Sequence, residues 1–586
     1  MLSERRSVWA LALLAFCLFL YVWRLGEIPF YTKGEPREAV QVWEEVHSGE
    51  WVLPLRNGRE LPSKPPLFHW IGGVTALITG TVDEFAVRFP SALLATLAVL
   101  LTFWLGSEKW GVLAGVYAGF IVATNFEWFR AATTARVDMT LTAFLTAAFV
   151  ALDRVVSAPF SPPPGALLGF YVSMGLAALA KGPVGIVLPM LTAVVYLAIT
   201  RDLARLRRMH LFAGGAIAGG IAVAWYVLAY LQGGESFVYK HLWVENVGRF
   251  FAAGESGAGH EHPFYYLVPA FVLNFAPWSF FLVPLGIFLN RIRDRLVTGG
   301  YAYELVWFAT VLVFYSVSQS KRSVYLLPAY PAAALLLGAW WQHLTNEAFA
   351  MPRTVIEALH WTGVFLAAAT VVLIGVLLAE GYGAEPLAIL RPLLSPKDQA
   401  NLPFVHEIIQ SRFSVVSLWI LALVPVLLLF LLSVRRRRWT LVFASLVAFF
   451  ASITSVVNGV FHPALAWRLT YKPFFEVVRG TVQPDDQIYF YKTFDYGAVF
   501  YSRRHIPPIK DPTEPASSAE RRTYVLMRSR TWERLPEERR ARLRYLHESD
   551  GGGPKGDSRL VFALVKSEEP APASSAGSEL DDDQNG

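Results

Sequence analysis

A short polar stretch near the start of the chain, residues 26–70, carries the side chains best suited to chemistry. It contains four charged residues of interest, Glu35, Arg37, Glu38 and Lys64. It directly follows an apolar run, but its many carboxylates, bases and prolines do not suit the interior of a bilayer, so we expect it to lie in water at a membrane surface. Pro36 suits the first turn of a helix, which predicts Glu35 as the N-cap and Glu38 as its capping-box partner. Alternatively, the helix dipole keeps Glu35 ionised so that it can accept a proton from an incoming hydroxyl or amine.

A second carboxylate, Asp138, lies at the start of a later apolar run and follows Thr133, Thr134 and Arg136. A carboxylate at the edge of an apolar layer is costly unless it is paired, so it is a candidate functional group by default. The structural alternative is a salt bridge to Arg136 or to another basic residue. Asp138 is therefore our second candidate catalytic acid.

Basic residues in segments that we place on the outer side form a third group. They are Lys64, Arg249, Lys321 and Arg322. Their position runs against the positive-inside rule, so it calls for another reason. A lipid phosphate supplies one, because arginine offers a fork for phosphate oxygens and lysine a compact point charge. The alternative is that these side chains snorkel toward lipid headgroups.

Histidines at 260 and 262, with Glu245 and Glu261 nearby, raise the question of a metal. The spacing of the two histidines does not place both rings on one helical face, so we assign Glu245 and His262 to acceptor binding or loop structure. Arg37 and Glu38 are candidates for the same role. No cofactor is predicted, although a divalent metal stays an open alternative. The sequence contains no phosphate-cradling glycine loop, which points away from a nucleotide and toward a donor carried in the membrane.

The composition predicts the element type that must hold these residues. Of 586 residues, 54% are hydrophobic and only 17% are charged, far outside the usual soluble range. The net charge of +6 falls in short clusters between apolar runs, where it orients helices, so we expect no nucleic-acid partner. The single cysteine, Cys17, permits neither a disulfide framework nor a cysteine metal site. We expect a polytopic membrane protein whose N-terminal apolar run is a retained signal anchor.

Apolar runs predict about thirteen membrane spans. They lie near 7–25, 88–106, 111–125, 137–152, 165–180, 184–200, 211–231, 265–289, 301–318, 324–341, 358–380, 414–433 and 439–459. With the N-terminus in the cytoplasm, the basic clusters at 5–6, 201–208, 291–295 and 435–438 all face inward, as the positive-inside rule requires. The same parity places 26–87, 126–136, 232–264, 319–323, 381–413 and the C-terminal region on the outer side.

The last part of the chain changes character. Short runs at 487–490, 497–501 and 559–565 are typical of strands between turns, so we expect a small soluble α/β domain. The sequence thus predicts a transmembrane domain over 1–459 with an outer loop at 26–87, a periplasmic domain over 460–566, and a disordered acidic tail over 567–586.

Several motifs in a fixed order resemble the membrane-embedded GT-C glycosyltransferases. The likeness is greatest to the lipid A 4-amino-4-deoxy-L-arabinose transferases and the protein O-mannosyltransferases. The motifs lie within residues 1–345 and read WVLPLRNG, SKPPLFHW, EFAVRFPSALL, RVDMTLTAF, AKGPVG, VENVGRFF, HPFYYL and APWS. The resemblance implies a transmembrane helical catalytic domain, an outer C-terminal domain and an inverting sugar transfer from a polyprenyl phosphate, such as undecaprenyl phosphate, on the periplasmic face.

The chain departs from the pattern of these transferases at two positions. They carry an Asp-Glu pair followed by x-Arg in the first outer loop, where this chain has Gly34, Glu35, Pro36 and Arg37. Glu35 therefore stands at the second acid. Either Glu35 or Asp138 is left to act as the base, or the protein uses another acceptor. The aminoarabinose enzymes also carry an acid before the lysine that matches Lys64, where this chain has Ser63.

We expect an inner-membrane glycosyltransferase that moves a sugar from a polyprenyl phosphate to a lipid, such as lipid A, or to a protein. Glu35 and Asp138 would activate or orient the acceptor, and Lys64, Arg249, Lys321 and Arg322 would neutralise the leaving phosphate. A proton-coupled lipid or solute transporter and a non-catalytic membrane scaffold are the alternatives. The sequence leaves the sugar, the acceptor, the role of the C-terminal domain and the oligomeric state open.

Overall fold

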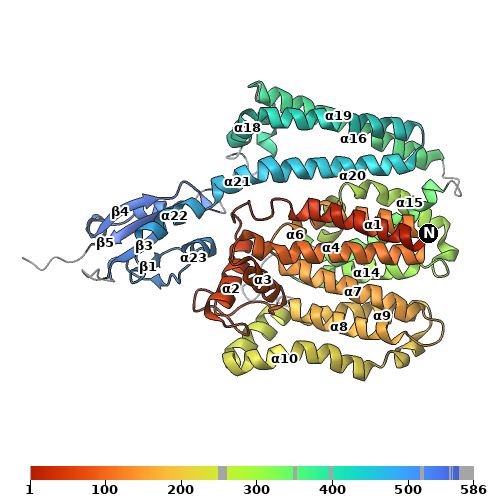
Figure 1. Cartoon of the computed structure of the whole chain (residues 1–586), viewed down its shortest axis with the longest axis horizontal. Helices are drawn as coiled ribbons and strands as arrows, with labels where there is room; N and C mark the ends of the chain where they lie inside the picture. Colours follow the sequence, from red (N-terminus) through yellow and green to blue (C-terminus); the bar gives the residue numbers. More distant parts are fainter. Residues whose placement is uncertain are drawn as a thin grey trace, which may run out of the picture. The chain divides into compact units, whose positions relative to one another are not determined.

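The computed structural model describes residues 2–248, 261–346, 353–394, 399, 402–514, 521–553, 556 and 558–566. The chain divides into two compact units, Met1–Trp467 and Arg468–Gly586. The first unit is helical and the second is built around a sheet (Figure 1). This confirms the predicted α-helical architecture with a small C-terminal α/β domain. The domain limits at 459 and 566 stay predictions, and the predicted acidic tail lies outside the described residues.

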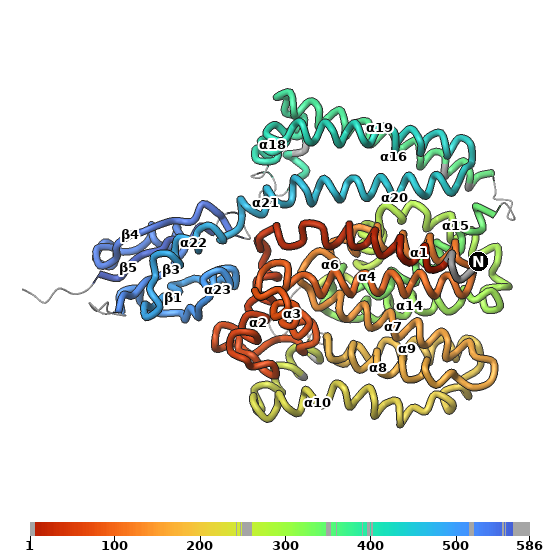
Figure 2. The backbone as a smooth tube through the Cα atoms, viewed as in Figure 1, coloured from red at the N-terminus to blue at the C-terminus, as the bar shows by residue number. Residues whose placement is uncertain are grey.

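The helices of the first unit follow one another with short links. In chain order they are α1 (Leu2–Cys17), η1 (Leu18–Val22), α2 (Gly34–Ser48), α3 (Leu67–Thr79), α4 (Glu84–Lys109), α5 (Val112–Ala123), α6 (Phe126–Ala132), α7 (Val137–Ser157), α8 (Pro164–Lys181), α9 (Val184–Ile199), η2 (Leu203–Met209), α10 (Leu211–Val238), η3 (Tyr239–Gly248), η5 (Phe264–Tyr266), α12 (Leu267–Asn274), η6 (Trp278–Phe281), α13 (Leu282–Arg291), η7 (Arg293–Arg295), α14 (Tyr301–Val317), η8 (Ser323–Ala329), α15 (Tyr330–Thr345), α16 (Arg353–Gly381), η9 (Pro386–Leu393), α18 (Leu402–Ser411), α19 (Phe413–Arg435), α20 (Trp439–Val456), η10 (Val457–Phe461) and α21 (His462–Leu469). The long helices run side by side, and α2 and α3 lie at the end of the bundle away from the N-terminus (Figures 1 and 2).

Apolar helices coincide with every predicted span. Within the described residues, eight helices are long and apolar enough to cross a membrane, and two further pairs would each make one bent span. Three shorter apolar helices, Arg6–Val22, Val184–Ile199 and Tyr301–Val317, fall on the remaining predicted spans. The chain is therefore a membrane protein, while the number of helices that cross, and the side on which each end lies, stay predictions.

One predicted span, 265–289, is broken, and another, 111–125, continues at a bend into the helix of residues 126–132, which the sequence predicted as an outer segment. Val112–Ala123 and Phe126–Ala132 meet at 68°, and Phe264–Asn274 and Trp278–Arg291 meet at 105°. At the first break, the side chain of Asn125 accepts a hydrogen bond from the backbone N–H of Trp128 at 2.9 Å, which starts a new helix. At the second, Pro277 has no backbone N–H to continue the helix ladder. The second break is absent from the sequence prediction, and so is the helix that follows the first one.

Close contact among α4, α5 and α15 forms the centre of the first unit. A Cβ atom on Gly115 would lie 2.3 Å from the carbonyl oxygen of Phe103, and one on Gly338 would lie 2.5 Å from that of Ala114. Only glycine at these two positions lets the helices approach so closely. The rigid core that results fixes the ends of the helices that carry the polar residues.

The second unit is a five-stranded mixed sheet with helices. Its elements are α22 (Lys472–Thr481), β1 (Gln487–Tyr491), α23 (Tyr496–Ser502), β2 (Pro508–Ile509), β3 (Thr523–Arg528), α24 (Ser529–Glu533), α25 (Glu537–Ala541), β4 (Leu543–Glu548) and β5 (Leu560–Val565). The strand order is β2-β1-β3-β5-β4, with β1 parallel to β2 and β3 and with β5 antiparallel to β3 and β4. The predicted strands at 487–490 and 559–565 are confirmed as β1 and β5.

The predicted strand at 497–501 is wrong, because these residues form the helix α23. The side chain of Asp495 accepts a hydrogen bond from the backbone N–H of Gly497 at 2.7 Å. This N-cap begins a helix where the run of apolar and aromatic residues alone indicates a strand.

Candidate active site

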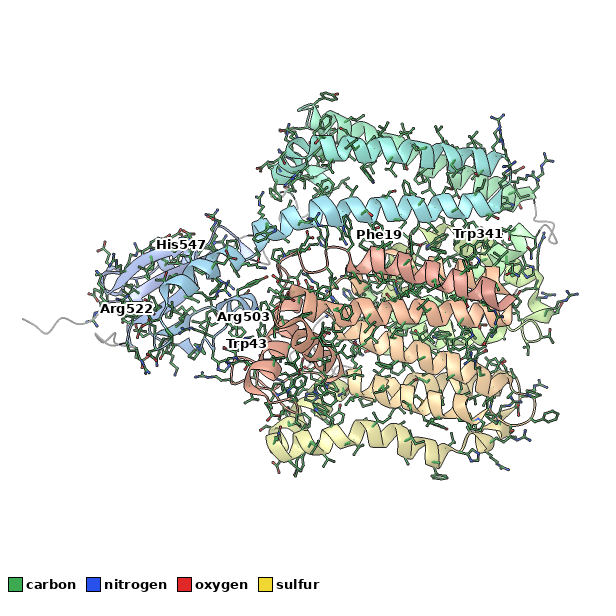
Figure 3. All side chains as sticks on the ribbon, viewed as in Figure 1. Phe19, Trp43, Trp341, Arg503, Arg522 and His547 are labelled. Carbon is green, nitrogen blue, oxygen red and sulfur yellow. The ribbon has the colours of Figure 1, made fainter. Side chains whose placement is uncertain are left out.

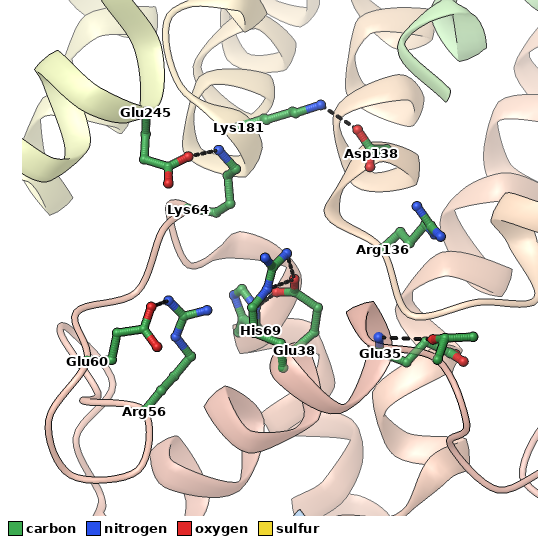
Figure 4. Close-up of polar contacts among 12 residues, drawn as sticks. Glu35, Glu38, Arg56, Glu60, Lys64, His69, Arg136, Asp138, Lys181 and Glu245 are labelled. Carbon is green, nitrogen blue, oxygen red and sulfur yellow. Dashed lines mark hydrogen bonds and ion pairs between the residues drawn. The ribbon is translucent and has the colours of Figure 1, made fainter. Parts of the chain in front are cut away.

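Polar side chains from distant parts of the chain gather at the end of the first unit that carries α2 and α3 (Figure 4). They come from the start of α2, from the loop before α3, from residues 133–138 and from the end of α8. Three of these regions contain residues that the sequence singles out. The following contacts decide which of these residues act together.

The carboxylate of Glu35 is buried and held by three donors. Arg88 donates from Nε to Oε1 at 2.7 Å and from Nη2 to Oε2 at 3.1 Å, and the backbone N–H of Ala135 donates to Oε1 at 3.1 Å. Burial raises the pKa of Glu35, but Arg88 and Ala135 outweigh burial and hold that pKa below its ordinary value. Glu35 is therefore ionised and ties α2 to the segment that leads to Asp138.

The predicted capping box at the start of α2 is wrong. Lys33 occupies the N-cap position, and no side chain caps the helix there. The physical reason is that the two acids have stronger partners. Glu35 binds the guanidinium of Arg88, and Glu38 binds Arg37 and His69.

Arg88 is the main residue that the sequence analysis missed. It lies in α4, is 3% exposed, and its Nη1 also donates to the carbonyl oxygens of Leu25 and Ile28. This buried arginine therefore holds the segment between η1 and α2 in place through its bonds to a carboxylate and to two backbone carbonyls. The available signal was an arginine within the apolar sequence EFAVRFPSALL, a costly position that indicates a specific partner.

Glu38 joins α2 to α3. Its Oε1 accepts from Nε and Nη2 of Arg37 at 3.1 and 2.7 Å, and its Oε2 lies 2.8 Å from Nε2 of His69. Burial raises the pKa of Glu38, but Arg37 and His69 hold it well below its ordinary value. The Arg37 side chain is 39% exposed, so it stays accessible beside this buried pair.

Asp138 lies in the first turn of α7 and forms an ion pair with Lys181, the last residue of α8. The ammonium group of Lys181 also lies 4.3 Å from the centre of the Tyr325 ring. A salt bridge was the structural alternative for Asp138, and its partner is Lys181. The motif AKGPVG, which separates two apolar runs, was the sequence signal for this lysine.

The side chains of three cations, at positions 136, 321 and 322, have no hydrogen-bond or ion-pair partner among the described residues. They are Arg136, Lys321 and Arg322. Arg136 and Arg322 lie within electrostatic range of Asp138, and Arg136 also within range of Glu35. Figure 4 shows Arg136 between the two carboxylates. Lys321 is 4% exposed. The arrangement provides uncompensated positive charge for an anion.

The remaining predicted residues have partners other than Asp138 or lie outside the described residues. Nζ of Lys64 donates to Oε2 of Glu245 at 2.8 Å, and both side chains are 11% exposed. His262 is exposed and stacks on Tyr266, with ring centroids 4.0 Å apart. Arg249 lies outside the described residues. Within the residues that the structure describes, no group of three or more His, Cys, Asp or Glu side chains is placed to hold a metal.

An apolar groove runs along two neighbouring helices, α9 and α14. It is open to solvent on one side and has an accessible volume of about 610 Å³. It is lined by Leu191, Val195, Ile199, Leu305, Val306, Ala309, Thr310, Val313, Phe314 and Val317. The helix α9 begins three residues after Lys181, and α14 ends four residues before Lys321. Chain connectivity therefore places the cations near one end of the groove.

Comparison with known proteins identifies this architecture. A family model described as dolichyl-phosphate-mannose-protein mannosyltransferase matches residues 63–227. The crystal structure of ArnT from Cupriavidus metallidurans bound to undecaprenyl phosphate superposes with a TM-score of 0.76 at 20% identity, over 95% of this chain and 98% of that one. The chain has the ArnT fold. The apo form of the same transferase superposes with a TM-score of 0.74.

Two sequence relatives of this chain are arabinosyl transferases. An undecaprenyl phosphate-alpha-4-amino-4-deoxy-L-arabinose arabinosyl transferase from Aeromonas salmonicida is 30% identical over 337 residues, which are 56% of this chain and 59% of the relative. One from an Enterobacter strain is 27% identical over 68% of this chain and 70% of the relative. The chain thus spans about three fifths of the length of the first of these relatives. The likeness to GT-C glycosyltransferases is confirmed in both sequence and fold.

Within the ArnT fold, Gly34 has room for a side chain. A Cβ atom placed on it would meet nothing within 4 Å. The acid that the resemblance implies at this position would therefore fit without a clash at its Cβ atom.

Proposed function

We propose that this protein is an integral-membrane glycosyltransferase that moves a sugar from a polyprenyl phosphate to a lipid or protein acceptor on the outer face of a bacterial inner membrane. The observation that carries the proposal is a pair of cations without partners, Arg136 and Arg322, within electrostatic range of the Asp138–Lys181 pair. Lys321 precedes Arg322 in the chain and also has no partner among the described residues. Uncompensated charge at the end of an apolar groove suits an amphiphile with an anionic head.

The donor would lie along α9 and α14 with its phosphate at these cations. Ten apolar or small side chains line the groove and suit an isoprenoid chain. Lys321 and Arg322 follow α14, while Lys181 precedes α9, so the phosphate would reach them where the groove ends. Lys64, paired with Glu245, and Arg249 are further candidates for the same phosphate.

The reaction would be a direct displacement at the anomeric carbon. An acceptor oxygen forms the new glycosidic bond while the bond between that carbon and the donor phosphate oxygen breaks, with inversion. The electron pair leaves on polyprenyl phosphate, whose charge the cations stabilise by several kcal/mol. Where the acceptor is a hydroxyl group, its proton passes to Asp138. Glu35 would position Asp138, because its carboxylate is already occupied by Arg88 and Ala135.

Transfer by the purified protein tests this proposal. The protein in detergent is given a panel of radiolabelled undecaprenyl-phosphate sugars with a total envelope extract, and label in lipid and protein fractions is counted with and without a chelator. We expect transfer by the wild type and a large loss in Asp138→Asn. A matched control is Asp294→Asn, since the Asp294 side chain is 92% exposed.

Two results would count against the proposal. If no sugar of the panel is bound or transferred, the protein is not such a transferase, and a transporter or scaffold becomes the better hypothesis. If Asp138→Asn keeps full transfer in a folded protein, the enzyme assignment holds but the role of Asp138 fails.

A further inference from the structure

The loop that carries Lys64 has many backbone acceptors and few backbone donors. Its sequence, LPSKPP at residues 61–66, contains three prolines, and a proline has no backbone N–H. Buried carbonyl groups need donors, so those of this loop depend on donors from elsewhere in the chain. The Lys64 side chain is only 11% exposed, so the path of the loop decides where its ammonium group lies.

Two neighbouring residues of η3 supply these donors. Nζ of Lys240 donates to the carbonyl oxygen of Leu61 at 2.7 Å, and Nε2 of His241 lies 2.7 Å from the carbonyl oxygen of Pro62. A carbonyl oxygen only accepts, so Nε2 of His241 carries a proton and donates it to this bond. Each contact joins residues 179 positions apart in the sequence. The fold therefore brings η3 to the loop at two successive residues.

Aromatic neighbours hold the His241 ring in place. The ring is 1% exposed, and its centroid lies 4.6 Å from that of Phe237, 5.5 Å from that of Trp225 and 6.2 Å from that of Tyr226. Trp225 also donates from Nε1 to the carbonyl oxygen of Val52 at 2.9 Å, so side chains of α10 pack against the outer loop (Figure 3). Close packing on several sides restricts the rotation of the ring. The N–H of His241 thus keeps one direction.

The last turn of η3 lies against the segments of two candidate phosphate lysines. Oε2 of Glu245 accepts a hydrogen bond from Nζ of Lys64 at 2.8 Å (Figure 4). Asn246 packs on the residue that follows Lys181, because a Cβ atom on Gly182 would lie 2.8 Å from Oδ1 of Asn246. Gly182 also has a φ of +93°, which few other residues adopt. The turn after Lys181 is therefore shaped to admit η3.

We propose that His241, together with Lys240, is a positioning residue that holds the loop of residues 61–66 so that Lys64 faces the donor phosphate. The proposal rests on the proposed function and gives η3 a role in it. His241 is buried among rings, so it acts through Lys64 and not on the substrates. Without these two donors the loop must leave carbonyl groups unpaired or move, and Lys64 moves with it.

Paired variants separate the hydrogen bond from the packing. His241→Phe keeps an aromatic ring but removes the donor, whereas His241→Gln keeps an N–H donor. Lys240→Met removes the other donor from a side chain that is 27% exposed, so it tests the same idea if His241→Phe does not fold. The matched control is His343→Phe. His343 also packs against a ring, that of Phe288, and lies 3.0 Å from the hydroxyl of Tyr301, at the end of α14 away from the candidate active site.

Binding of undecaprenyl phosphate is the first test. The purified full-length protein in detergent is titrated with tritiated undecaprenyl phosphate, and thermal unfolding shows which variants are folded. We expect His241→Phe and Lys240→Met to raise the dissociation constant about five- to tenfold, the loss expected for one hydrogen bond. His241→Gln and His343→Phe should bind like the wild type. An unchanged dissociation constant in both His241→Phe and Lys240→Met would overturn the proposal.

A double-variant cycle shows whether His241 acts through Lys64. In the Lys64→Met background, the effect of His241→Phe on binding should disappear, because the residue that it positions is gone. Equal effects of His241→Phe with and without Lys64 would mean that the histidine only stabilises the fold. That result would overturn the proposal.

The second test needs no donor. The folded protein is treated with sulfosuccinimidyl acetate, and mass spectrometry follows acetylation of Lys64 beside that of Lys33, an exposed lysine. We expect His241→Phe to acetylate several-fold faster at Lys64 with no change at Lys33, and His241→Gln to resemble the wild type. This result, with no binding of undecaprenyl phosphate by the wild type, would uphold the positioning of Lys64 while the proposed function fails. Equal acetylation of Lys64 in the wild type and His241→Phe would overturn the positioning role.

Discussion

Arg88 of α4 donates hydrogen bonds to both carboxylate oxygens of Glu35, which lies 53 residues earlier in the sequence. The distances are 2.7 Å from Nε to Oε1 and 3.1 Å from Nη2 to Oε2. Both side chains are almost fully buried, at 4% and 3% exposed. The pair therefore connects α4 to α2. The backbone N–H of Ala135 also donates to Glu35, which connects α2 to the loop that precedes Asp138.

We expect removal of either partner to destabilise the protein. Glu35→Gln and Arg88→Met should each lower the free energy of unfolding by about 3–5 kcal/mol, because each leaves a buried group without its partner. Thermal unfolding in detergent measures this. The control is Arg154→Gln in the half-exposed Arg154–Glu108 pair, where about 0–1 kcal/mol is expected. A Glu35→Gln variant that unfolds like the wild type yet transfers no sugar would instead make Glu35 the base.

Asp138→Asn should separate catalysis from donor binding. Loss of a general base typically lowers the rate by about 10²–10⁴. Donor affinity should stay the same or rise, since the change removes a negative charge next to Arg136, Arg322 and Lys181. Single-turnover transfer and equilibrium binding of the labelled donor provide the two measurements. Donor binding lost together with transfer would show that Asp138 holds the site together rather than acting on the acceptor.

Lys321→Met and Arg322→Met should weaken donor binding about tenfold or more, the loss expected for a hydrogen bond to a charged group. Folding should change little, because neither side chain has an ion-pair partner among the described residues. Added salt should weaken donor binding by the wild type more than by the variants. Arg293→Gln, at a side chain 73% exposed, is the control. Donor affinity that is unchanged in both variants would move the phosphate site elsewhere.

Glu45 of α2 should make the protein less stable as pH rises. It is fully buried, and neither carboxylate oxygen has a hydrogen-bond partner in the described part of the chain. Burial raises the pKa of Glu45 well above its ordinary value. The folded state thus binds a proton that the unfolded state releases above its own pKa of about 4.3. This stability is present below that pH and is lost as pH rises toward the folded pKa.

The Glu45→Gln variant should therefore unfold at a higher temperature than the wild type at pH 8, with a difference that shrinks as pH falls toward 4. Unfolding in detergent across this range measures it. The pH dependence of stability from the Glu35–Arg88 pair has the opposite sign. The pKa of Glu35 is lowered in the folded state, so the stability that this pair contributes is lost as pH falls. A Glu45→Gln advantage that is equal at all pH values would mean that Glu45 does not change its proton on unfolding.

The sequence by itself determined the class of the protein and the position of its helices. Composition required a membrane protein, and each predicted apolar run coincides with an apolar helix, because burial of apolar length in a bilayer leaves a signal in consecutive residues. The ordered motifs indicated the GT-C resemblance, which sequence and fold confirm. Asp138 also stood out, since a carboxylate at the edge of an apolar run is rare.

Only the tertiary structure decided which charges meet. Glu35 was expected to cap α2, but Arg88 reaches it from 53 positions away, and Asp138 pairs with Lys181 from another helix. Helix-capping preferences concern residues close together in sequence, so they cannot predict these contacts, which depend on how close two helices come in the folded bundle.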